Sequence, residues 1–122
     1  MRPAEENRKT GDDMAKHTFG IMEEAPTAQQ KFLHYEPENY RSVDVNDRYI
    51  EPLLKELTEM MCYWHSLNRK ELGLCYCGIT LIPPESLDMF ISAVMGNKRL
   101  EELCSLLLDA QREKRFVIHF GI

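Results

Sequence analysis

Hydrophobic and polar residues alternate in three segments of the chain, as they do in β-strands. These segments are residues 15–22, 74–82 and 116–122. The last of them is apolar on both faces, which is typical of a strand in the interior of a sheet. A glycine followed by isoleucine occurs in each segment, at Gly20, Gly78 and Gly121. We expect these glycines to lie in one sheet, where backbone or a helix comes close.

Apolar residues that recur every three or four positions predict helices elsewhere. The longest predicted helix covers residues 50–64, with Pro52 in its first turn. Proline is tolerated there because its missing N–H would have no partner in that turn. Asn46 or Asp47 is the expected N-cap, since either side chain can accept a hydrogen bond from the first free amides.

Two more helices are expected in the second half of the chain. One opens at Pro83 and Pro84, which are tolerated in its first turn, and the other covers residues 98–114. Gly96 can adopt the left-handed conformation that ends the first of these helices, and Asn97 can cap the second.

Residues 23–46 are the least regular part of the sequence. Thr27 and Gln30 have the spacing of a capping box and predict a short helix. Val43 and Val45 alternate with polar residues and predict a short strand. With the other elements, this predicts an α+β domain with a three- or four-stranded mixed sheet and about three helices packed mainly on one face, in the order β-(β)-α-β-α-α-β.

Composition limits the classes of function. The chain has 122 residues, 15 of them basic and 20 acidic, and its net charge of −5 is unfavourable for electrostatic binding of nucleic acid. No apolar stretch approaches the roughly 18 residues that cross a bilayer, so we expect no membrane span. No apolar run follows the basic residues near the start, so we expect a cytoplasmic protein with reduced cysteines.

The first 13 residues are polar, carry charges of both signs and show no hydrophobic periodicity. They predict a disordered arm over residues 1–13, followed by a single domain over residues 14–122. If Gly11 is encoded as GGA, the next base completes a ribosome-binding sequence just before Met14. The sequence thus leaves open whether translation starts at Met1 or Met14.

Four side chains have the chemistry of zinc ligands: Cys62, His65, Cys75 and Cys77. On the predicted elements, Cys62 and His65 share one helix face, and Cys75 and Cys77 share one strand face. A short loop would bring the two pairs together. The alternative is a set of buried reduced thiols, since a disulfide between two cysteines on the same side of one strand would be strained.

Histidine offers a second kind of chemistry. His17 and His119 lie on the first and last predicted strands and could form an acid/base pair or a pH switch if those strands were neighbours. Whether they share a face depends on the register of the sheet. A small enzyme or ligand-binding protein that uses His17, His65 or His119 is therefore one alternative. The sequence contains no nucleophile elbow and no phosphate-binding glycine loop, so we assign no catalytic residues.

Acidic and aromatic residues are concentrated in the first half of the chain. Residues 23–51 carry seven acidic and three basic residues, a local net charge of −4. The predicted partner-binding residues are Tyr35, Glu36, Glu38, Tyr40, Asp44 and Asp47. Aromatic anchors supply contact area and carboxylates attract a basic partner, whereas the alternative is a solvated loop. We expect a non-catalytic intracellular protein-interaction module, with a basic protein or a second copy of the chain as its partner.

Overall fold

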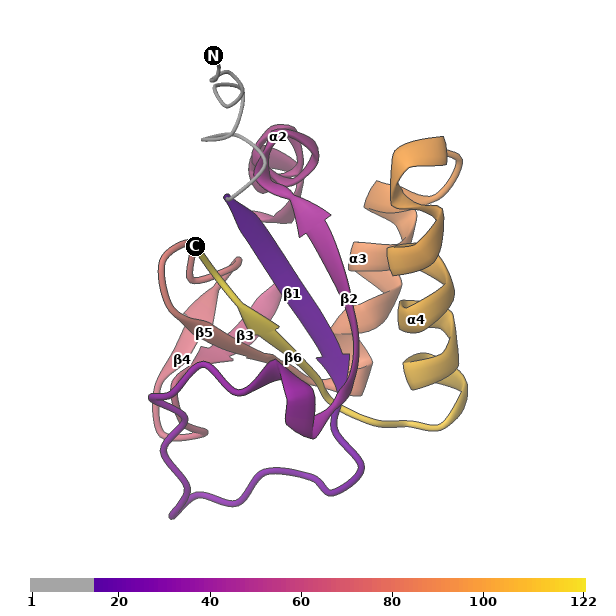
Figure 1. Ribbon diagram of the computed structural model, residues 1–122. Coiled ribbons are helices and arrows are strands. Elements are labelled where there is room, and N and C mark those ends of the chain that lie inside the picture. Colours follow the sequence, from indigo (N-terminus) through magenta and orange to yellow (C-terminus); the bar gives the residue numbers. More distant parts are fainter. Residues whose placement is uncertain (1–14) are drawn as a thin grey trace.

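The chain folds around a six-stranded sheet (Figure 1). A computed structural model describes residues 15–122. In spatial order the strands are β2, β1, β6, β5, β3 and β4. Their bounds are Lys16–Ile21 (β1), Arg41–Asn46 (β2), Met61–Trp64 (β3), Lys70–Leu72 (β4), Ile79–Ile82 (β5) and Val117–Phe120 (β6). The C-terminal strand therefore lies between β1 and β5 in the interior of the sheet, as its apolar faces predicted.

This sheet corrects the predicted architecture. The α+β class fits, but the sheet has six strands rather than three or four. All its pairings are antiparallel, so it is not mixed. The helices and strands follow one another in the order β-β-α-β-β-β-α-α-β. The strands that the sequence did not predict are β3 and β4, which form a hairpin at one edge.

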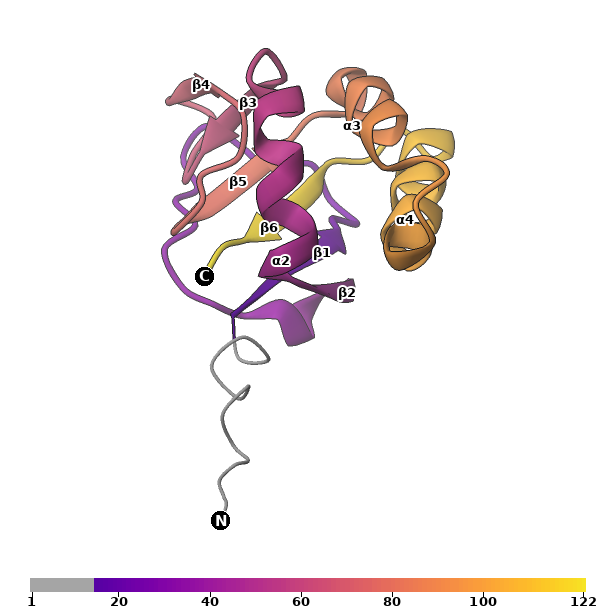
Figure 2. The same ribbon diagram turned by 90° about the horizontal axis from the view of Figure 1, so that it is seen from above.

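Three helices lie on one face of the sheet (Figure 2). They are α2 (Asp47–Ile50), which continues as the 3-10 helix η2 (Glu51–Leu57), α3 (Leu87–Val94) and α4 (Glu101–Arg112). Shorter 3-10 turns are η1 (Pro37–Asn39), η3 (Pro84–Ser86) and η4 (Lys98–Leu100). The main hydrophobic core lies between these helices and the sheet, where Phe19 meets Phe90 edge-on at 5.5 Å between ring centroids.

The predicted helix over residues 50–64 is wrong in its second half. Helical structure ends at Leu57, and Met61–Trp64 form β3. Met60 and Cys62 are fully buried at the two-residue spacing of a strand. Over so short a stretch, helical and strand spacing select overlapping apolar positions, and sheet pairing decides between them.

The predicted strand over residues 74–82 begins only at Ile79. Before it, the Gly78 amide donates to the Cys75 carbonyl at 3.1 Å and closes a tight turn. Cys75 and Cys77 therefore do not share a strand face. The strain expected for a disulfide between two strand residues does not apply to them.

Two predicted helix caps are confirmed. Asn46 and Asn97 accept hydrogen bonds from the amides of Arg48 and Arg99, each at 2.9 Å. Gly96 follows α3 with a φ of 86°, the left-handed conformation that glycine adopts without strain. These local signals depend on neighbouring residues alone, which is why the sequence was sufficient to find them.

The helix predicted after Thr27 is absent. The Thr27 amide donates to Gln30 Oε1 at 2.8 Å, and the Gln30 amide donates to the Thr27 carbonyl at 3.1 Å. The first contact is one half of a capping box, but the second is a backbone bond that closes an isolated turn. The chain continues irregularly up to Pro37.

The three Gly-Ile glycines do not all lie in the sheet, so that prediction is wrong. Gly20 is in β1, whereas Gly78 and Gly121 lie just beyond the ends of β5 and β6 and pair through a 2.7 Å hydrogen bond from the Gly121 amide. The predicted close approach is confirmed. A Cβ at Gly121 would lie 2.0 Å from the Tyr76 carbonyl oxygen, and one at Gly20 would lie 2.8 Å from Tyr40 Cβ.

The predicted disordered arm over residues 1–13 and the alternative start at Met14 lie outside the described residues. A single domain over residues 14–122 stays a prediction. Within residues 15–122, no helix combines the length and the apolar character needed to cross a bilayer.

Replacing Gly121 with alanine should destabilise the protein. The new Cβ would overlap the backbone of the turn at Tyr76, so the end of β6 or the turn must move. We expect the free energy of unfolding to fall by about 1–3 kcal/mol, the range seen for overpacking. Urea unfolding measures this change, with Ser105→Ala on the exposed face of α4 as the control. Equal midpoints for the two variants would contradict the prediction.

Candidate functional site

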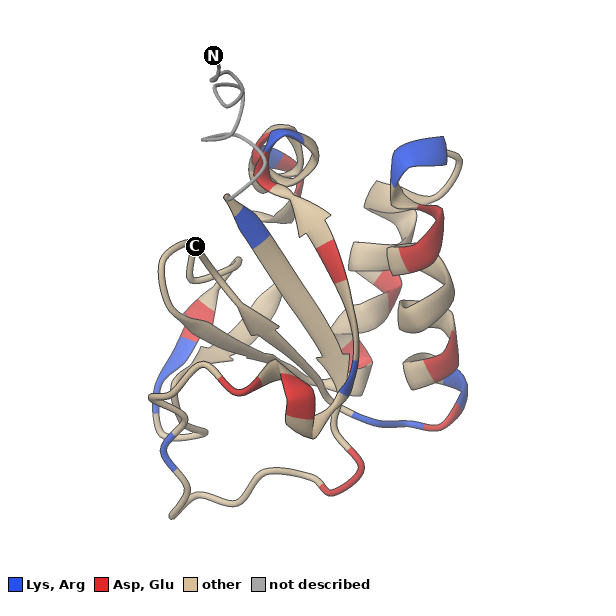
Figure 3. Cartoon of the chain, viewed as in Figure 1, with Lys and Arg blue, Asp and Glu red and all other residues tan. Residues whose placement is uncertain are grey.

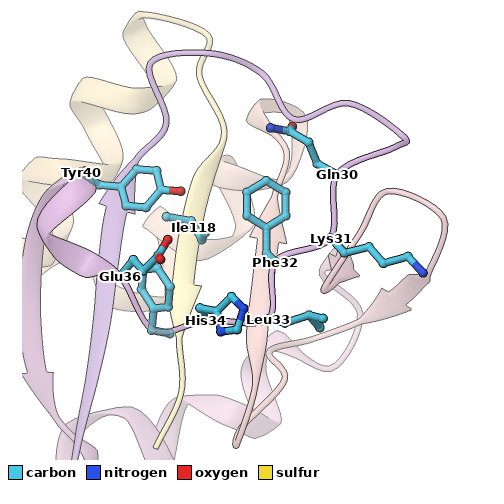
Figure 4. Close-up of a pocket in the computed structure, with 9 residues that line it drawn as sticks. Gln30, Lys31, Phe32, Leu33, His34, Glu36, Tyr40 and Ile118 are labelled. Atoms are coloured by element: carbon cyan, nitrogen blue, oxygen red, sulfur yellow. The ribbon is translucent and has the colours of Figure 1, made fainter.

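A long loop, residues 23–40, lies on the face of the sheet opposite the main core, and we call it the acidic segment. Phe32 and Tyr40 attach it to a second, smaller hydrophobic cluster that contains Ile118. Figure 4 shows the two rings on either side of Ile118. The Phe32 amide also donates to the His65 carbonyl at 2.7 Å. The middle of the segment is thus fixed to the sheet by side chains and backbone.

Two large apolar side chains of the acidic segment are exposed. The exposed fraction is 62% for Leu33 and 65% for Tyr35. The Tyr35 ring meets Phe120 edge-on, with 5.5 Å between centroids. Beside them is a pocket of 190 Å³, here called the Tyr35 pocket. Its lining includes Leu33, Tyr35, His65, Cys77, Ile79 and Phe120.

The segment carries four acidic residues and one basic residue (Figure 3). Glu36 and Glu38 are exposed, and within residues 15–122 neither takes part in an ion pair. Lys31 points away from a second pocket of 220 Å³ under the segment (Figure 4). The negative charge of this surface is therefore not neutralised by neighbouring described side chains.

The structure brings together four of the six predicted partner-binding residues. These four, Tyr35, Glu36, Glu38 and Tyr40, belong to the acidic segment. Asp44 lies on the edge strand β2, where its carboxylate accepts a hydrogen bond from Thr18 Oγ1 at 2.8 Å. Asp47 begins α2 and has a different environment.

Asp47 is the outer end of a hydrogen-bonded chain that runs into the core, which we call the histidine chain. Asp47 Oδ1 lies 2.9 Å from His17 Nε2, and His17 Nδ1 lies 2.9 Å from His119 Nε2. His119 Nδ1 lies 3.0 Å from Thr80 Oγ1, which accepts the Cys75 amide at 2.8 Å. Both imidazoles have an exposed fraction of 0%. The chain therefore connects a half-buried carboxylate to two histidines that solvent does not reach.

The register of the sheet answers the question that the sequence left open. His119 of β6 is directly opposite Phe19 of β1 and Thr80 of β5. Because side chains alternate along a strand, His17 and His119 project from the same face. Their rings stack at 5.1 Å between centroids.

One arrangement of protons satisfies the chain when both histidines are neutral. An ionised Asp47 can only accept, so His17 Nε2 carries the proton and His17 Nδ1 accepts from His119 Nε2. His119 Nδ1 then accepts the Thr80 hydroxyl proton. Adding one proton to the two histidines creates a buried imidazolium. Adding a second proton places an N–H of His17 against an N–H of His119.

The environment disfavours such added protons. Burial lowers the pKa of His17, with Asp47 acting in the opposite direction. Burial, followed by the charge of His17, holds the pKa of His119 well below its usual value. Burial raises the pKa of Asp47, but hydrogen bonds from Tyr76 and His17 outweigh it, and the net shift is downward. The Tyr76 hydroxyl donates to Asp47 Oδ1 at 2.7 Å, and this bond raises the pKa of Tyr76 to about 12.

The structure does not assemble the alternative zinc site. Cys62 is fully buried in the main core, whereas His65 and Cys75 approach each other at 3.9 Å at the turn before β5. Among residues 15–122, no group of three or more His, Cys, Asp or Glu side chains is placed to hold a metal ion. Burial also raises the pKa of the Cys62 thiol to about 12, which disfavours the thiolate that zinc requires.

Comparison with known proteins adds no family to this geometry. No family model, no curated protein and no solved structure matches the chain. The function is therefore inferred from the described residues alone.

Sequence reasoning missed Thr80, Tyr76 and Leu33. Thr80 falls within the predicted strand over residues 74–82, and the structure buries it fully beside His119. Tyr76 reaches Asp47 only because residues 75–78 form a turn rather than a strand. Leu33 lies on irregular backbone after the turn at Thr27, where the sequence predicts a short helix. No local pattern in the sequence indicates where these three side chains lie.

The histidine chain should make stability depend on pH between about 5 and 6.5. Unfolded histidines have a pKa of about 6.5 and the folded pKa values are lower, so the unfolded chain binds more protons in this window. Stability is therefore complete above about pH 6.5 and falls as the pH decreases, by up to about 1.4 kcal/mol per pH unit for each proton. Urea unfolding at a series of pH values measures the slope.

A matched control removes the two histidines that lie outside the chain. In the double variant His34→Asn/His65→Asn, His17 and His119 keep their partners, so the slope should be retained. A free energy of unfolding that does not change between pH 7 and pH 5 in the natural sequence would contradict the assignment. The window lies above the usual pKa of carboxyl groups, which keeps their contribution small.

Proposed function

We propose that this protein is a non-catalytic protein-interaction module that binds a basic, extended segment of another protein. The observation that carries the proposal is the pair of exposed side chains, Leu33 and Tyr35, on an acidic segment fixed to the sheet. Large apolar side chains at the surface of a soluble domain favour a binding role when they gather beside a pocket.

The Tyr35 pocket has the size for one side chain of a partner. Its volume of 190 Å³ is below the range of roughly 300–1,000 Å³ that is typical of small-molecule sites. Tyr35 and Phe120 form aromatic walls, and such walls supply contact area at a low cost in conformational entropy. An apolar side chain of the partner fits this pocket.

The charge of the segment selects the flanking residues of the partner. Glu36 and Glu38 are exposed on the same segment as Tyr35. A lysine or arginine beside the inserted apolar residue would be attracted by these carboxylates, which favours both the rate of association and specificity. The proposed partner segment therefore combines one large apolar residue with neighbouring basic residues.

The segment is held in place before binding. Asn68 Nδ2 donates to the Ala28 carbonyl at 3.0 Å, and the Arg115 guanidinium donates to the Glu23 carbonyl. A loop that is already ordered loses less conformational entropy when a partner binds. The histidine chain supports the non-catalytic assignment, because its two imidazoles are fully buried and a substrate has no access to them.

Selection from displayed random peptides tests the proposal. Peptides retained by the full chain should contain an excess of lysine and arginine around one large apolar residue. The double variant Leu33→Ser/Tyr35→Ser should weaken their binding at least about tenfold, which corresponds to about 1.4 kcal/mol. Isothermal titration with the synthetic peptides measures the dissociation constants.

The matched control is Leu72→Ser/Met95→Ser, which removes two equally exposed side chains elsewhere, with exposed fractions of 58% and 61%. This control should leave binding unchanged. Glu36→Gln/Glu38→Gln should weaken binding and reduce its dependence on salt. Selected peptides without basic residues, or equal losses in the two serine variants, would show the proposal to be wrong.

A further inference from the structure

The Cys75 thiol and the His65 imidazole meet at the tight turn before β5, and the same turn carries Cys77. The Gly78 amide donates to the Cys75 carbonyl, and Cys77 occupies the turn between them. The turn is firmly held, because the Tyr76 hydroxyl donates to Asp47 and the Tyr76 carbonyl accepts the last amide of the chain at 3.0 Å. Alternate residues of such a turn come within the Cα separation that a disulfide spans, about 4.4–6.8 Å.

His65 is oriented toward the first of these thiols. Its Nε2 lies 3.9 Å from Cys75 Sγ, and its Nδ1 lies 3.0 Å from the Phe32 carbonyl oxygen. Because a carbonyl can only accept, Nδ1 of the neutral ring carries the proton and Nε2 presents a lone pair to the thiol. His65 also has a φ of 68°, a left-handed conformation that non-glycine residues rarely adopt and that is concentrated at functional sites.

Gly78 leaves space beside this pair. A Cβ at this position would lie 2.6 Å from Cys75 Sγ and 2.7 Å from His65 Nε2. Gly78, Cys77 and His65 also line the Tyr35 pocket. The absence of a side chain at position 78 thus allows the thiol, the imidazole and the pocket to adjoin.

We propose that Cys75, Cys77 and His65 form a site for thiol–disulfide exchange with low-molecular-weight disulfides. The exposed Cys77 is the attacking thiol, Cys75 is the resolving thiol, and His65 is its base. This activity requires neither Leu33 nor the carboxylates of the acidic segment, although His65 and Cys77 also line the Tyr35 pocket.

The exchange proceeds in two balanced steps. Cys77 gives up its proton to solvent, and its thiolate attacks a substrate disulfide, so a Cys77–substrate S–S bond forms while the substrate S–S bond breaks. The first substrate thiolate leaves and takes up a proton from solvent. His65 Nε2 then accepts the Cys75 proton, and Cys75 Sγ attacks Cys77 Sγ. The second substrate thiolate leaves and takes up that proton. In total, the protein loses two hydrogens and one disulfide becomes two thiols.

The electrostatic environment distinguishes the roles of the two cysteines. Burial raises the pKa of Cys75, so its thiol stays protonated at rest and requires the imidazole as a base. After burial and the opposing charge of Arg69, the charge of a Cys77 thiolate also raises the pKa of Cys75. Cys77 is the exposed thiol, as an attacking group must be. Cys62 is buried and Cys104 is half-buried in the main core.

Mass spectrometry of the reduced full chain treated with bis(2-hydroxyethyl) disulfide tests the site. The natural sequence should lose two hydrogens, and peptide mapping should locate the new disulfide between Cys75 and Cys77. Cys75→Ser should stop at a stable mixed disulfide on Cys77. Cys77→Ser should form neither product.

A further variant tests the base without disturbing the backbone. Asparagine tolerates the left-handed conformation of position 65, so His65→Asn should still form the mixed disulfide but close the internal one at least about tenfold more slowly. A natural sequence that retains the mixed disulfide, or that is modified equally fast at Cys104, would overturn the proposal. An unchanged rate of closure in His65→Asn would overturn the role of His65. Failure of peptide binding would leave these results unaffected.

Discussion

The hydrogen bond between His17 and His119 is the contact on which the rest of the fold depends. It joins the first and last strands inside a core that is otherwise mostly apolar, and Asp47 and Thr80 extend it to α2 and β5. An unpaired buried polar group costs about 1–3 kcal/mol. Any arrangement that separates the two rings would therefore lose several hydrogen bonds together. If leucine or valine occupied these positions, separating the two strands would not carry this penalty.

The two faces of the sheet are consequently used in different ways. The face with the histidine chain is covered by α2, α3 and α4, and the chain ends at the half-buried Asp47, which Tyr76 also contacts. The opposite face is covered by irregular backbone, which leaves concave space and exposed side chains between its anchors. Loops carry function more often than the elements they connect, because they tolerate this kind of incomplete packing. The features suited to recognition and to thiol chemistry both lie at the Tyr35 pocket, next to the rigid centre of the sheet.

Sequence patterns predicted the elements that depend on neighbouring residues. α3 and α4, their joint at Gly96, and the strands β1 and β6 follow from local spacing and caps. The hairpin of β3 and β4 was missed because Met60, Met61 and Trp64 continue the helical spacing of the apolar residues before them, and only pairing with β4 and β5 favours the strand. For the same reason the acidic segment could be recognised by composition, whereas the contact of Asp47 with the buried His17 could not. Contacts such as His17 to His119 join residues far apart in the sequence, and no local rule gives their register.

The histidine chain specifies the register between β1 and β6. A shift of one residue between β1 and β6 would turn His119 to the face of the acidic segment, where it would meet Ile79 and Leu81 instead of Thr80. A shift of two residues would keep the face but move His119 away from His17. Apolar residues on these strands would tolerate such slips, because one branched side chain packs much like another. The directional hydrogen bonds of the two imidazoles do not tolerate such slips, since each ring nitrogen has one partner. The buried polar chain thus fixes the alignment of the C-terminal strand, and with it the close approach of Gly121 to the turn that carries the two thiols.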